Sequence, residues 1–340
     1  MRPKIHFLIK NAPKVLLGAF FLFTSCDQEK TSSKSPPVEE HTKTSSSTAA
    51  DPDPSGIDPA ETPASPDEVR FLSYNIKNYL TMKRYSREGP PTESFKPENE
   101  ITALIEIIVN EGPDILGICE IGVKENLEDL QARLKKAGLD LPHVVHAGGR
   151  DETRHLGLLS ALPIDRTDSE HHLPFVLGDN EYLMGRGILD ATITLPKGPT
   201  RFIGVHLKSK RPSDAYDEAE MRLNEARLLR EHVNEIQAEN PEARIVVYGD
   251  FNDTRKTPPL SMIMGRKGSK GYLGDIFVKD SRQHLWTHYW SYQQQYARFD
   301  YVLVSNSVMP EMNFSRSYIV DPPNWYDASD HRAIMVAFGR

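Results

Sequence analysis

Cysteine is scarce in this chain of 340 residues, which contains only Cys26 and Cys119. A framework of several disulfides is therefore excluded, and a chain of this length can rely on a hydrophobic core instead. Basic residues are not in excess, because 41 Lys and Arg stand against 48 Asp and Glu, giving a formal net charge of −7. Charge alone therefore gives no sign of tight, non-specific binding to nucleic acid. The sequence also lacks evident internal repeats.

Long hydrophobic runs are missing too, apart from a short one near the N-terminus. Several basic residues precede the apolar run at residues 15–23, which is too short to span a bilayer as a mature helix. Small residues and Cys26 follow this run, and the pattern resembles a bacterial lipoprotein signal. We therefore predict a signal peptide at residues 1–26 and lipidation of Cys26. The mature protein would then be anchored to a membrane of the bacterial cell envelope, with a periplasmic or extracellular domain. A plain secretory signal with an incidental cysteine is the alternative.

Residues 27–67 are rich in Ser, Thr, Pro, Lys and acidic residues and have almost no large apolar side chains. Such a segment buries too little to offset the entropy of ordering, so we predict a disordered tether. The remaining domain covers residues 68–340. Cys119 would be the only unmodified cysteine of the mature protein, and its apolar surroundings indicate a small buried residue rather than a nucleophile. We expect a monomer.

The domain alternates short hydrophobic runs with amphipathic segments. Helices are predicted around residues 101–108 and 127–134, and a long one is expected to begin near Ser213 and Asp214. The charged residues of the long helix are assigned mostly to its solvated face, and none is given a function; they are Glu220, Arg222, Glu225, Arg227 and Glu231. Strands are predicted at residues 69–76, 115–119, 144–145, 156–161, 188–195, 202–207, 245–248, 299–304 and 333–338. Many short strands and few helices indicate packed sheets with helices outside them.

Polar side chains stand directly at the ends of several of these strands. Asp250 and Asn252 follow one buried run, Asp330 and His331 precede another, and Glu120 ends a third. Side chains at the end of a buried strand are held rigidly, and carboxylates, amides and imidazoles there can hold a metal and activate water. On an extended segment, Asp250 and Asn252 would point to the same side.

An ordered set of motifs carries a family resemblance. They are residues 73–76 (SYNI), 113–120 (PDILGICE), 158–164 (LLSALPI), 204–209 (GVHLKS), 248–253 (YGDFND), 298–301 (RFDY) and 329–331 (SDH). In this order they resemble the endonuclease/exonuclease/phosphatase superfamily, which includes deoxyribonuclease I. The resemblance covers about residues 69–338. It implies an α/β fold of the α+β type, a four-layer sandwich of two packed mixed β-sheets flanked by helices, and metal-dependent cleavage of phosphate esters.

The resemblance also implies roles for individual side chains. Glu120 would bind Mg²⁺, or Mn²⁺ or Ca²⁺ in its place, with Asn75 as ligand or orienting residue and Asp330 as a second ligand. Asp250 would orient or deprotonate the attacking water. Asn252 would hydrogen-bond the nucleophile or a phosphate oxygen.

Two histidines complete the implied site. His206 would donate a hydrogen bond to a phosphate oxygen. His331 would pair with Asp300, and this pair either takes a proton from water or, when protonated, contacts the scissile phosphate. The sequence leaves both options open.

Four further residues are candidates for binding substrate. Arg186 matches an arginine often found in the family before the same strand. Lys208 can guide an anionic substrate, or it can belong to a solvated loop. Trp286 and Trp290 lie in an aromatic cluster that can stack on a base, a sugar or a lipid glycerol, with core packing as the alternative.

Departures from the family patterns narrow the expected activity. Cys119 and Ser73 replace the Gln and Trp usual in abasic-site enzymes, and residues 298–301 depart from the inositol polyphosphate phosphatases. We therefore predict a metal-dependent phosphodiesterase acting on a phosphate ester, with nucleic acid as the favoured substrate and an endonuclease as the favoured type. The alternatives are a phosphomonoesterase, a sphingomyelinase-like phospholipid phosphodiesterase and, less favoured, a non-catalytic binding lipoprotein.

Overall fold

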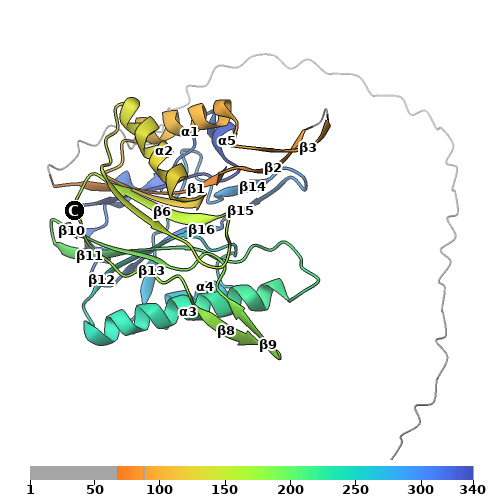
Figure 1. Cartoon of the computed structure of the whole chain (residues 1–340). Helices are drawn as coiled ribbons and strands as arrows, with labels where there is room; N and C mark the ends of the chain where they lie inside the picture. Colours follow the sequence, from red (N-terminus) through yellow and green to blue (C-terminus); the bar gives the residue numbers. More distant parts are fainter. Residues whose placement is uncertain (1–66, 87–88, 340) are drawn as a thin grey trace, which may run out of the picture. The chain divides into compact units, whose positions relative to one another are not determined.

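The protein is described by a computed structural model that covers residues 67–86 and 89–339 (Figure 1). These residues belong to one compact unit of the chain, Gly56–Arg340. The predicted signal with Cys26 and the predicted tether, except for Asp67, lie outside the described residues. Within the described ranges, no helix has both the length and the hydrophobicity needed to cross a bilayer.

Two six-stranded sheets form the centre of the domain. The first has the order β17 (Tyr318–Ile319), β18 (Ile334–Phe338), β1 (Val69–Tyr79), β4 (Ile115–Ile121), β6 (His155–Ser160), β5 (His143–Ala147). The second has the order β13 (Leu273–Asp275), β16 (Asp300–Ser305), β12 (Arg244–Asp250), β11 (Gly198–His206), β10 (Leu189–Leu195), β7 (Ile164–Thr167). Both sheets are mixed, because each contains one parallel pair among antiparallel ones.

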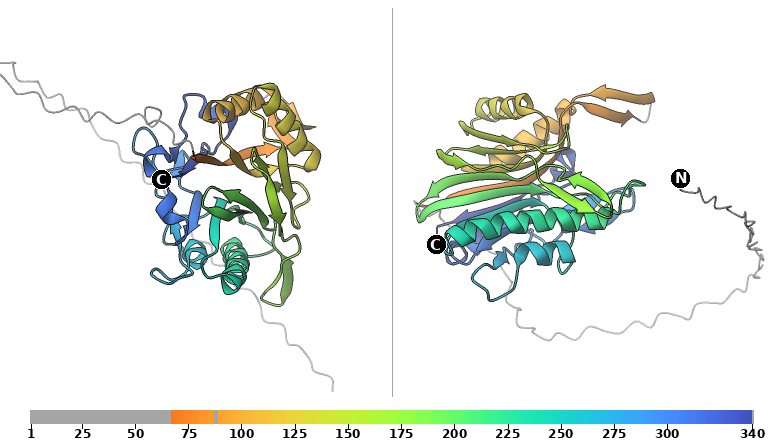
Figure 2. Two further views of the ribbon diagram at one scale, coloured as in Figure 1. Left: turned by 90° about the vertical axis from the view of Figure 1, so that its left-hand side faces the viewer. Right: turned by 60° about the horizontal axis from the view of Figure 1, so that its bottom comes forward.

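The parallel pairs have the same construction in both sheets. Strands β1 and β4 are joined through helix α1 (Glu98–Glu111), and β11 and β12 are joined through helix α3 (Glu218–Glu239). A parallel pair requires a crossover connection, and a helix that covers the sheet supplies it. Helices α2 (Lys124–Lys136) and α5 (Trp325–Ala328) lie with α1, and α4 (Pro258–Met264) lies with α3 (Figures 1 and 2).

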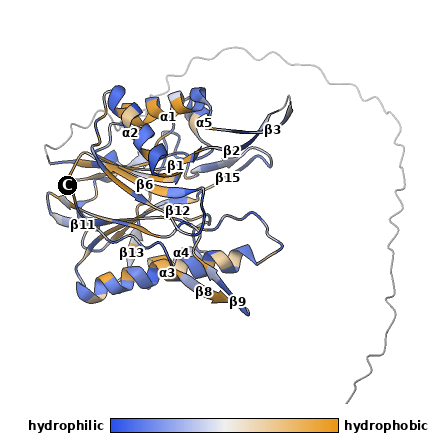
Figure 3. Cartoon of the chain, in the orientation of Figure 1, coloured by the Kyte–Doolittle hydropathy of each residue, from blue (hydrophilic) through white to orange (hydrophobic). Residues whose placement is uncertain are grey.

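Hydrophobic packing divides the domain into four layers. One cluster fills the space between the sheets, where the Phe71 ring lies 5.1 Å from that of Phe202 and 4.8 Å from that of Tyr248. The other two clusters lie under α1 and α2 and under α3 and α4. Strand β6 accordingly shows much hydrophobic colour, whereas α3 carries residues of both kinds (Figure 3). The predicted four-layer sandwich of two mixed sheets is confirmed.

Close contact between the sheets requires small residues at particular points. A Cβ atom on Gly117 would lie only 2.2 Å from the Tyr248 ring. Cys119 is 1% exposed and its thiol lies 3.3 Å from the carbonyl oxygen of Val205, in agreement with its prediction as a small buried residue. Small residues at these points therefore leave room for the Tyr248 ring and for close packing of the two sheets.

Helix α3 corrects two predictions. It begins at Glu218 rather than near Ser213, because the Asp217 carboxylate caps it by accepting the backbone N–H groups of residues 219 and 220. Its charged residues were assigned mostly to the solvated face, but Arg222 and Glu225 are 2% and 1% exposed. They are buried because loops from neighbouring strands cover this part of the helix and hydrogen-bond to them.

Three two-stranded hairpins extend beyond the sheets and had no prediction from the sequence. They are β2 (Met82–Ser86) with β3 (Gly89–Ser94), β8 (Pro174–Leu177) with β9 (Asn180–Leu183), and β14 (His288–Trp290) with β15 (Gln295–Ala297). Short 3-10 helices at Met309–Glu311 and Phe314–Arg316 connect β16 to β17. Hairpin β14–β15 matters for the site, because His288 forms an antiparallel bridge with His331.

Candidate active site

Three acidic or imidazole side chains lie in register across the second sheet. His206 ends β11, Asp250 ends β12 and Asp300 begins β16, and the sheet pairs His206 with Asp250 and Asp250 with Asp300. Since β16 runs antiparallel to the other two strands, its start meets their ends at one edge of the sheet. All three residues are 2% exposed. Strand register therefore brings together residues that are almost a hundred positions apart.

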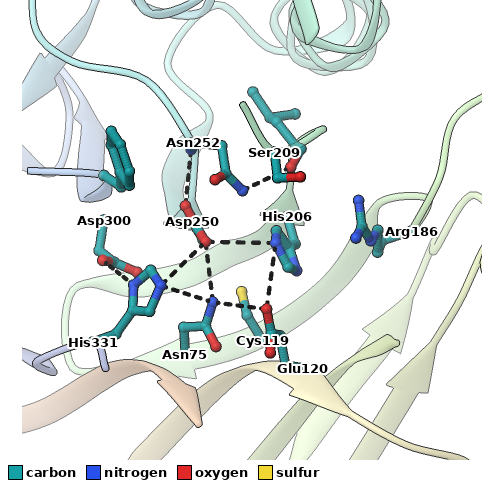
Figure 4. Close-up of polar contacts among 12 residues, drawn as sticks. Asn75, Cys119, Glu120, Arg186, His206, Ser209, Asp250, Asn252, Asp300 and His331 are labelled. Atoms are coloured by element: carbon teal, nitrogen blue, oxygen red, sulfur yellow. Dashed lines mark hydrogen bonds and ion pairs between the residues drawn. The ribbon is translucent and has the colours of Figure 1, made fainter. Parts of the chain in front are cut away.

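The first sheet supplies Asn75 from β1 and Glu120 from β4. The Asn75 Nδ2 group donates to Asp250 Oδ2 over 3.0 Å and lies 3.5 Å from Glu120 Oε1. Glu120 has a φ of 66° at a point where β4 slips its register against both neighbours. Such a bulge redirects a side chain, and here it accompanies the turn of the carboxylate toward the second sheet (Figure 4).

His331 lies between the two sheets. Its Nδ1 atom is 2.8 Å from Asp300 Oδ2, and its Nε2 atom is 3.7 Å from Asp250 Oδ2. Its backbone N–H donates to Ser329 Oγ, which in turn donates to the carbonyl oxygen of Asn75. The imidazole is thus oriented by a carboxylate on one ring nitrogen and directed at Asp250 by the other (Figure 4).

Asp250 and His331 have shifted pKa values because they are buried beside each other. Burial raises the pKa of Asp250 to about 7, with Asp300 and Glu120 adding to the rise and His331 opposing it. For His331, burial works against the charged form, but the carboxylates of Asp300 and Asp250 outweigh it and raise the pKa to about 10. The imidazole of His331 therefore keeps its proton at neutral pH. The pKa of Asp250, in contrast, lies close to neutral pH, so its carboxylate can gain or lose a proton there.

His206 has the opposite character. Burial, together with nearby Arg186 and His331, lowers the pKa of His206 well below its usual value. Its Nε2 atom lies 3.5 Å from Asp250 Oδ2, and its Nδ1 atom has no hydrogen-bond partner in the described part of the chain. Arg186 lies beside it and is held by an ion pair of 3.3 Å with Asp151 (Figure 4). A neutral imidazole and a guanidinium are thus available to an anion at this point.

The oxygen donors of the site fit a divalent cation. Asp250, Asp300 and His331 have potential ligand atoms within 4.8 Å of one another, and because the imidazole holds its proton, the two carboxylates are the ligand candidates of this group. Glu120 lies across from them, and among the described residues its carboxylate contacts the Asn75 amide, the Asn78 N–H and His206. Convergent carboxylates suit Mg²⁺ or a similar ion, which would offset their repulsion. Glu120 and Asn75 remain the predicted ligands.

The contacts of Asp330 and the backbone of Asn252 differ from what their predicted roles require. The Asp330 carboxylate makes no hydrogen bond or ion pair to another described residue, although its charge contributes to the raised pKa of His331. Asn252 has a φ of 50°, so the chain turns there and is not extended as expected. Its side chain donates to the carbonyl oxygen of Leu207, while its backbone N–H donates to Asp250 Oδ1. Asn252 thus holds Asp250 in place.

The predicted substrate-binding residues lie on two sides of the site. The Lys208 ammonium group contacts backbone oxygens of its own loop and lies 5.8 Å from the Tyr216 ring. Trp286 packs on the Arg332 guanidinium and on neighbouring aromatic rings, so part of its surface is occupied. Trp290 is 47% exposed, and its strand begins at His288, opposite His331.

Sequence reasoning missed several residues that shape the site. The His288 ring lies 4.6 Å from that of His331, and burial followed by the charge of His331 lowers the pKa of His288 to about 4. Lys96 is buried and donates to the carbonyl oxygens of Lys77 and Ala328, so it ties the ends of β1 and α5 together. The position of His288 inside the aromatic cluster could have indicated from the sequence that it belongs to the site. Nothing in the local sequence indicates a role for Lys96.

A family model describing the endonuclease/exonuclease/phosphatase family matches residues 61–329. The chain belongs to this family. Its members are generally phosphoric ester hydrolases and are typically dependent on a divalent metal. No curated protein gave a significant match in the comparison.

Solved structures of the family share the fold at low sequence identity. The human Nocturnin catalytic domain with bound sulfate superposes with a TM-score of 0.55 at 15% identity, covering 80% of this chain and 94% of that one. Truncated TDP2 from Caenorhabditis elegans gives a TM-score of 0.53 at 16% identity, covering 80% and 98%. Staphylococcus aureus beta toxin with bound magnesium ions gives 0.52 at 16% identity, covering 80% and 100%.

Proposed function

We propose that this family member is a divalent-metal-dependent phosphodiester hydrolase and that nucleic acid is its substrate. The observation that carries the proposal is the meeting of His206, Asp250 and Asp300 at one sheet edge, with Asn75 and Glu120 facing them from the other sheet. A site of this kind combines oxygen donors for a metal with a base and two imidazoles for a phosphate.

The pKa values of the side chains assign one of them as the base and two as hydrogen-bond donors. Asp250 accepts the proton of the attacking water, because its raised pKa makes it a better base than an ordinary carboxylate. His331 remains protonated and faces the charge that develops on the phosphate, with Asp300 fixing its ring. His206 donates a hydrogen bond in its neutral form. A metal bound by Glu120 and Asn75 would supply Lewis-acid polarisation of the phosphate.

A nucleic-acid substrate is supported by surface features near His331. Trp290 and Tyr292 are 47% and 86% exposed, and their rings lie 6.1 Å apart on hairpin β14–β15. Exposed aromatic rings beside a phosphate site can stack on unpaired bases. The same rings, with the predicted membrane anchor, would also suit a lipid phosphodiester, and Streptomyces griseocarneus sphingomyelinase C shares the fold with a TM-score of 0.50 at 15% identity.

The test compares substrates with one preparation of the protein from residue 56 onward. Bis(p-nitrophenyl) phosphate, p-nitrophenyl phosphate, DNA, RNA and sphingomyelin vesicles are incubated with Mg²⁺ or Mn²⁺. Cleavage of the diester and of DNA or RNA, with little monoester turnover, supports the proposal. A preference for the monoester would indicate a phosphomonoesterase. Strong cleavage of sphingomyelin without cleavage of DNA or RNA would indicate a lipid substrate instead of nucleic acid. No cleavage of any of the five substrates would favour a binding protein.

We also propose that Cys26 is lipidated and anchors the domain in the cell envelope. The support is the sequence pattern of residues 1–26 alone. Metabolic labelling with a radioactive fatty acid tests this, because label should appear in the full chain and be absent from Cys26→Ser. Equal labelling of both proteins would contradict the anchor.

A further inference from the structure

The paired residues His331 and Asp300 come from different sheets. Asp300 begins β16 in the second sheet, and His331 lies three residues before Ile334, the first residue of β18 in the first sheet. Their 2.8 Å contact therefore depends on how the start of one strand is held against the start of the other. A shift of either backbone would change the direction of the imidazole.

Thr287 hydrogen-bonds to both of these backbones. Its Oγ1 atom accepts the N–H groups of Asp300, over 3.0 Å, and of Phe299, over 3.1 Å. Its carbonyl oxygen accepts the N–H of Arg332, the residue after His331, over 2.6 Å. Thr287 is completely buried, and its own N–H donates to the carbonyl oxygen of Ala297.

The residues around Thr287 make this connection stiff. The Arg332 guanidinium is 2.7 Å from the Asp280 carboxylate and stacks on the Trp286 ring, which is next to Thr287 in the chain. His288, on the other side of Thr287, bridges to His331. The segment carrying Thr287 is thus fixed to the loop at Asp280 and to the strand at His331.

We propose that Thr287 is a positioning residue, whose hydroxyl and carbonyl groups together set the distance and angle between His331 and Asp300. A threonine hydroxyl oxygen has two acceptor sites, and the N–H groups of Phe299 and Asp300 use both. Valine has nearly the same shape but no acceptor, so Thr287→Val leaves two N–H groups without their partner. Serine keeps the hydroxyl and loses only a methyl group.

The kinetic test rests on the proposed function and compares kcat with KM for a diester. Thr287→Val should lower kcat roughly 30- to 100-fold with KM changed less than about twofold, because a displacement near 1 Å is enough for such a loss. Thr287→Ser should stay within about threefold of the wild type. The control is Thr200→Val, which removes another buried hydroxyl from β11, far along the strand from His206. It should lower stability but not kcat.

A second readout does not depend on activity. Proton NMR should show a downfield signal for the His331 Nδ1 proton, identified by its loss in His331→Gln. The signal should persist in Thr287→Ser and in Thr200→Val, and should move or broaden in Thr287→Val. If Thr287→Val does not fold, Thr287→Ala takes its place. An unmoved signal together with an unchanged kcat in the variant without the hydroxyl would overturn the positioning role of Thr287. An inactive wild type would reject the proposed function, while the NMR comparison would still test Thr287.

Discussion

The raised pKa of His331 gives a stability prediction whose size can be worked out. A pKa of about 10 in the folded protein, against about 6.5 unfolded, corresponds to about 4 kcal/mol at pH 7 and about 1 kcal/mol at pH 9. The sign follows from proton binding: the folded state holds the proton more tightly, so this stability is present at low pH and is lost as the pH rises through 10. Asp250 shares the effect with Asp300. We therefore expect Asp300→Asn to cost about 2–3 kcal/mol at pH 7 and under about 1 kcal/mol at pH 9.

The assay is urea unfolding at the two pH values with a chelator present, so that bound metal does not contribute. Asp275→Asn is the matched control, because Asp275 has a side chain only 1% exposed and pairs with Arg298. The arginine stays charged throughout this range, so the cost of the control, about 3 kcal/mol, should be the same at both pH values. A cost of Asp300→Asn that is equal at pH 7 and pH 9 would refute the charged imidazole.

Two further predictions concern the metal site and the close pairing of β11 with β12. Glu120→Gln should weaken the apparent affinity for Mg²⁺ roughly 10- to 100-fold, measured as the metal dependence of diester hydrolysis. It should change the free energy of unfolding by less than about 1 kcal/mol. An unchanged metal dependence would exclude Glu120 as a ligand. Gly249→Ala should destabilise the protein by about 2 kcal/mol or more in urea unfolding. The reason is that Gly249 has a φ of 127° and a Cβ atom there would lie 2.0 Å from the Val205 carbonyl oxygen. A neutral effect would show that β11 and β12 can separate.

The strands and helices of the core were predictable because their hydrophobic periodicity is strong. The run ending at Asp250 is continuous because β12 lies in the middle of a sheet covered on both faces. The stripe at residues 101–108 faces the first sheet from α1. The site residues at the ends of these strands were predictable as well, because polar residues directly follow or precede strongly hydrophobic runs. The four-layer arrangement itself came from the ordered motifs, since no local pattern states which sheet lies on which.

Other features depend on contacts that the local sequence does not contain. Arg222 and Glu225 have the spacing of a solvated helix face, yet loops from β10 and β11 bury them. Asn252 adopts a left-handed turn that the strand-like pattern before it did not suggest. Nothing in the local sequence distinguishes Thr287, which in the fold accepts backbone N–H groups from Phe299, Asp300 and Arg332.

The central claim is that this site hydrolyses a phosphodiester with a divalent metal and Asp250 as base. The most direct measurement is hydrolysis of bis(p-nitrophenyl) phosphate by the protein from residue 56 onward, with Mg²⁺, with chelator, and with Asp250→Asn. Exposed Asp179, in the turn between β8 and β9, provides the control Asp179→Asn. We predict turnover that disappears with chelator, returns with Mg²⁺, falls at least about 100-fold in Asp250→Asn and is unchanged in the control. Turnover that survives the chelator, or that Asp250→Asn retains in full, would contradict the account.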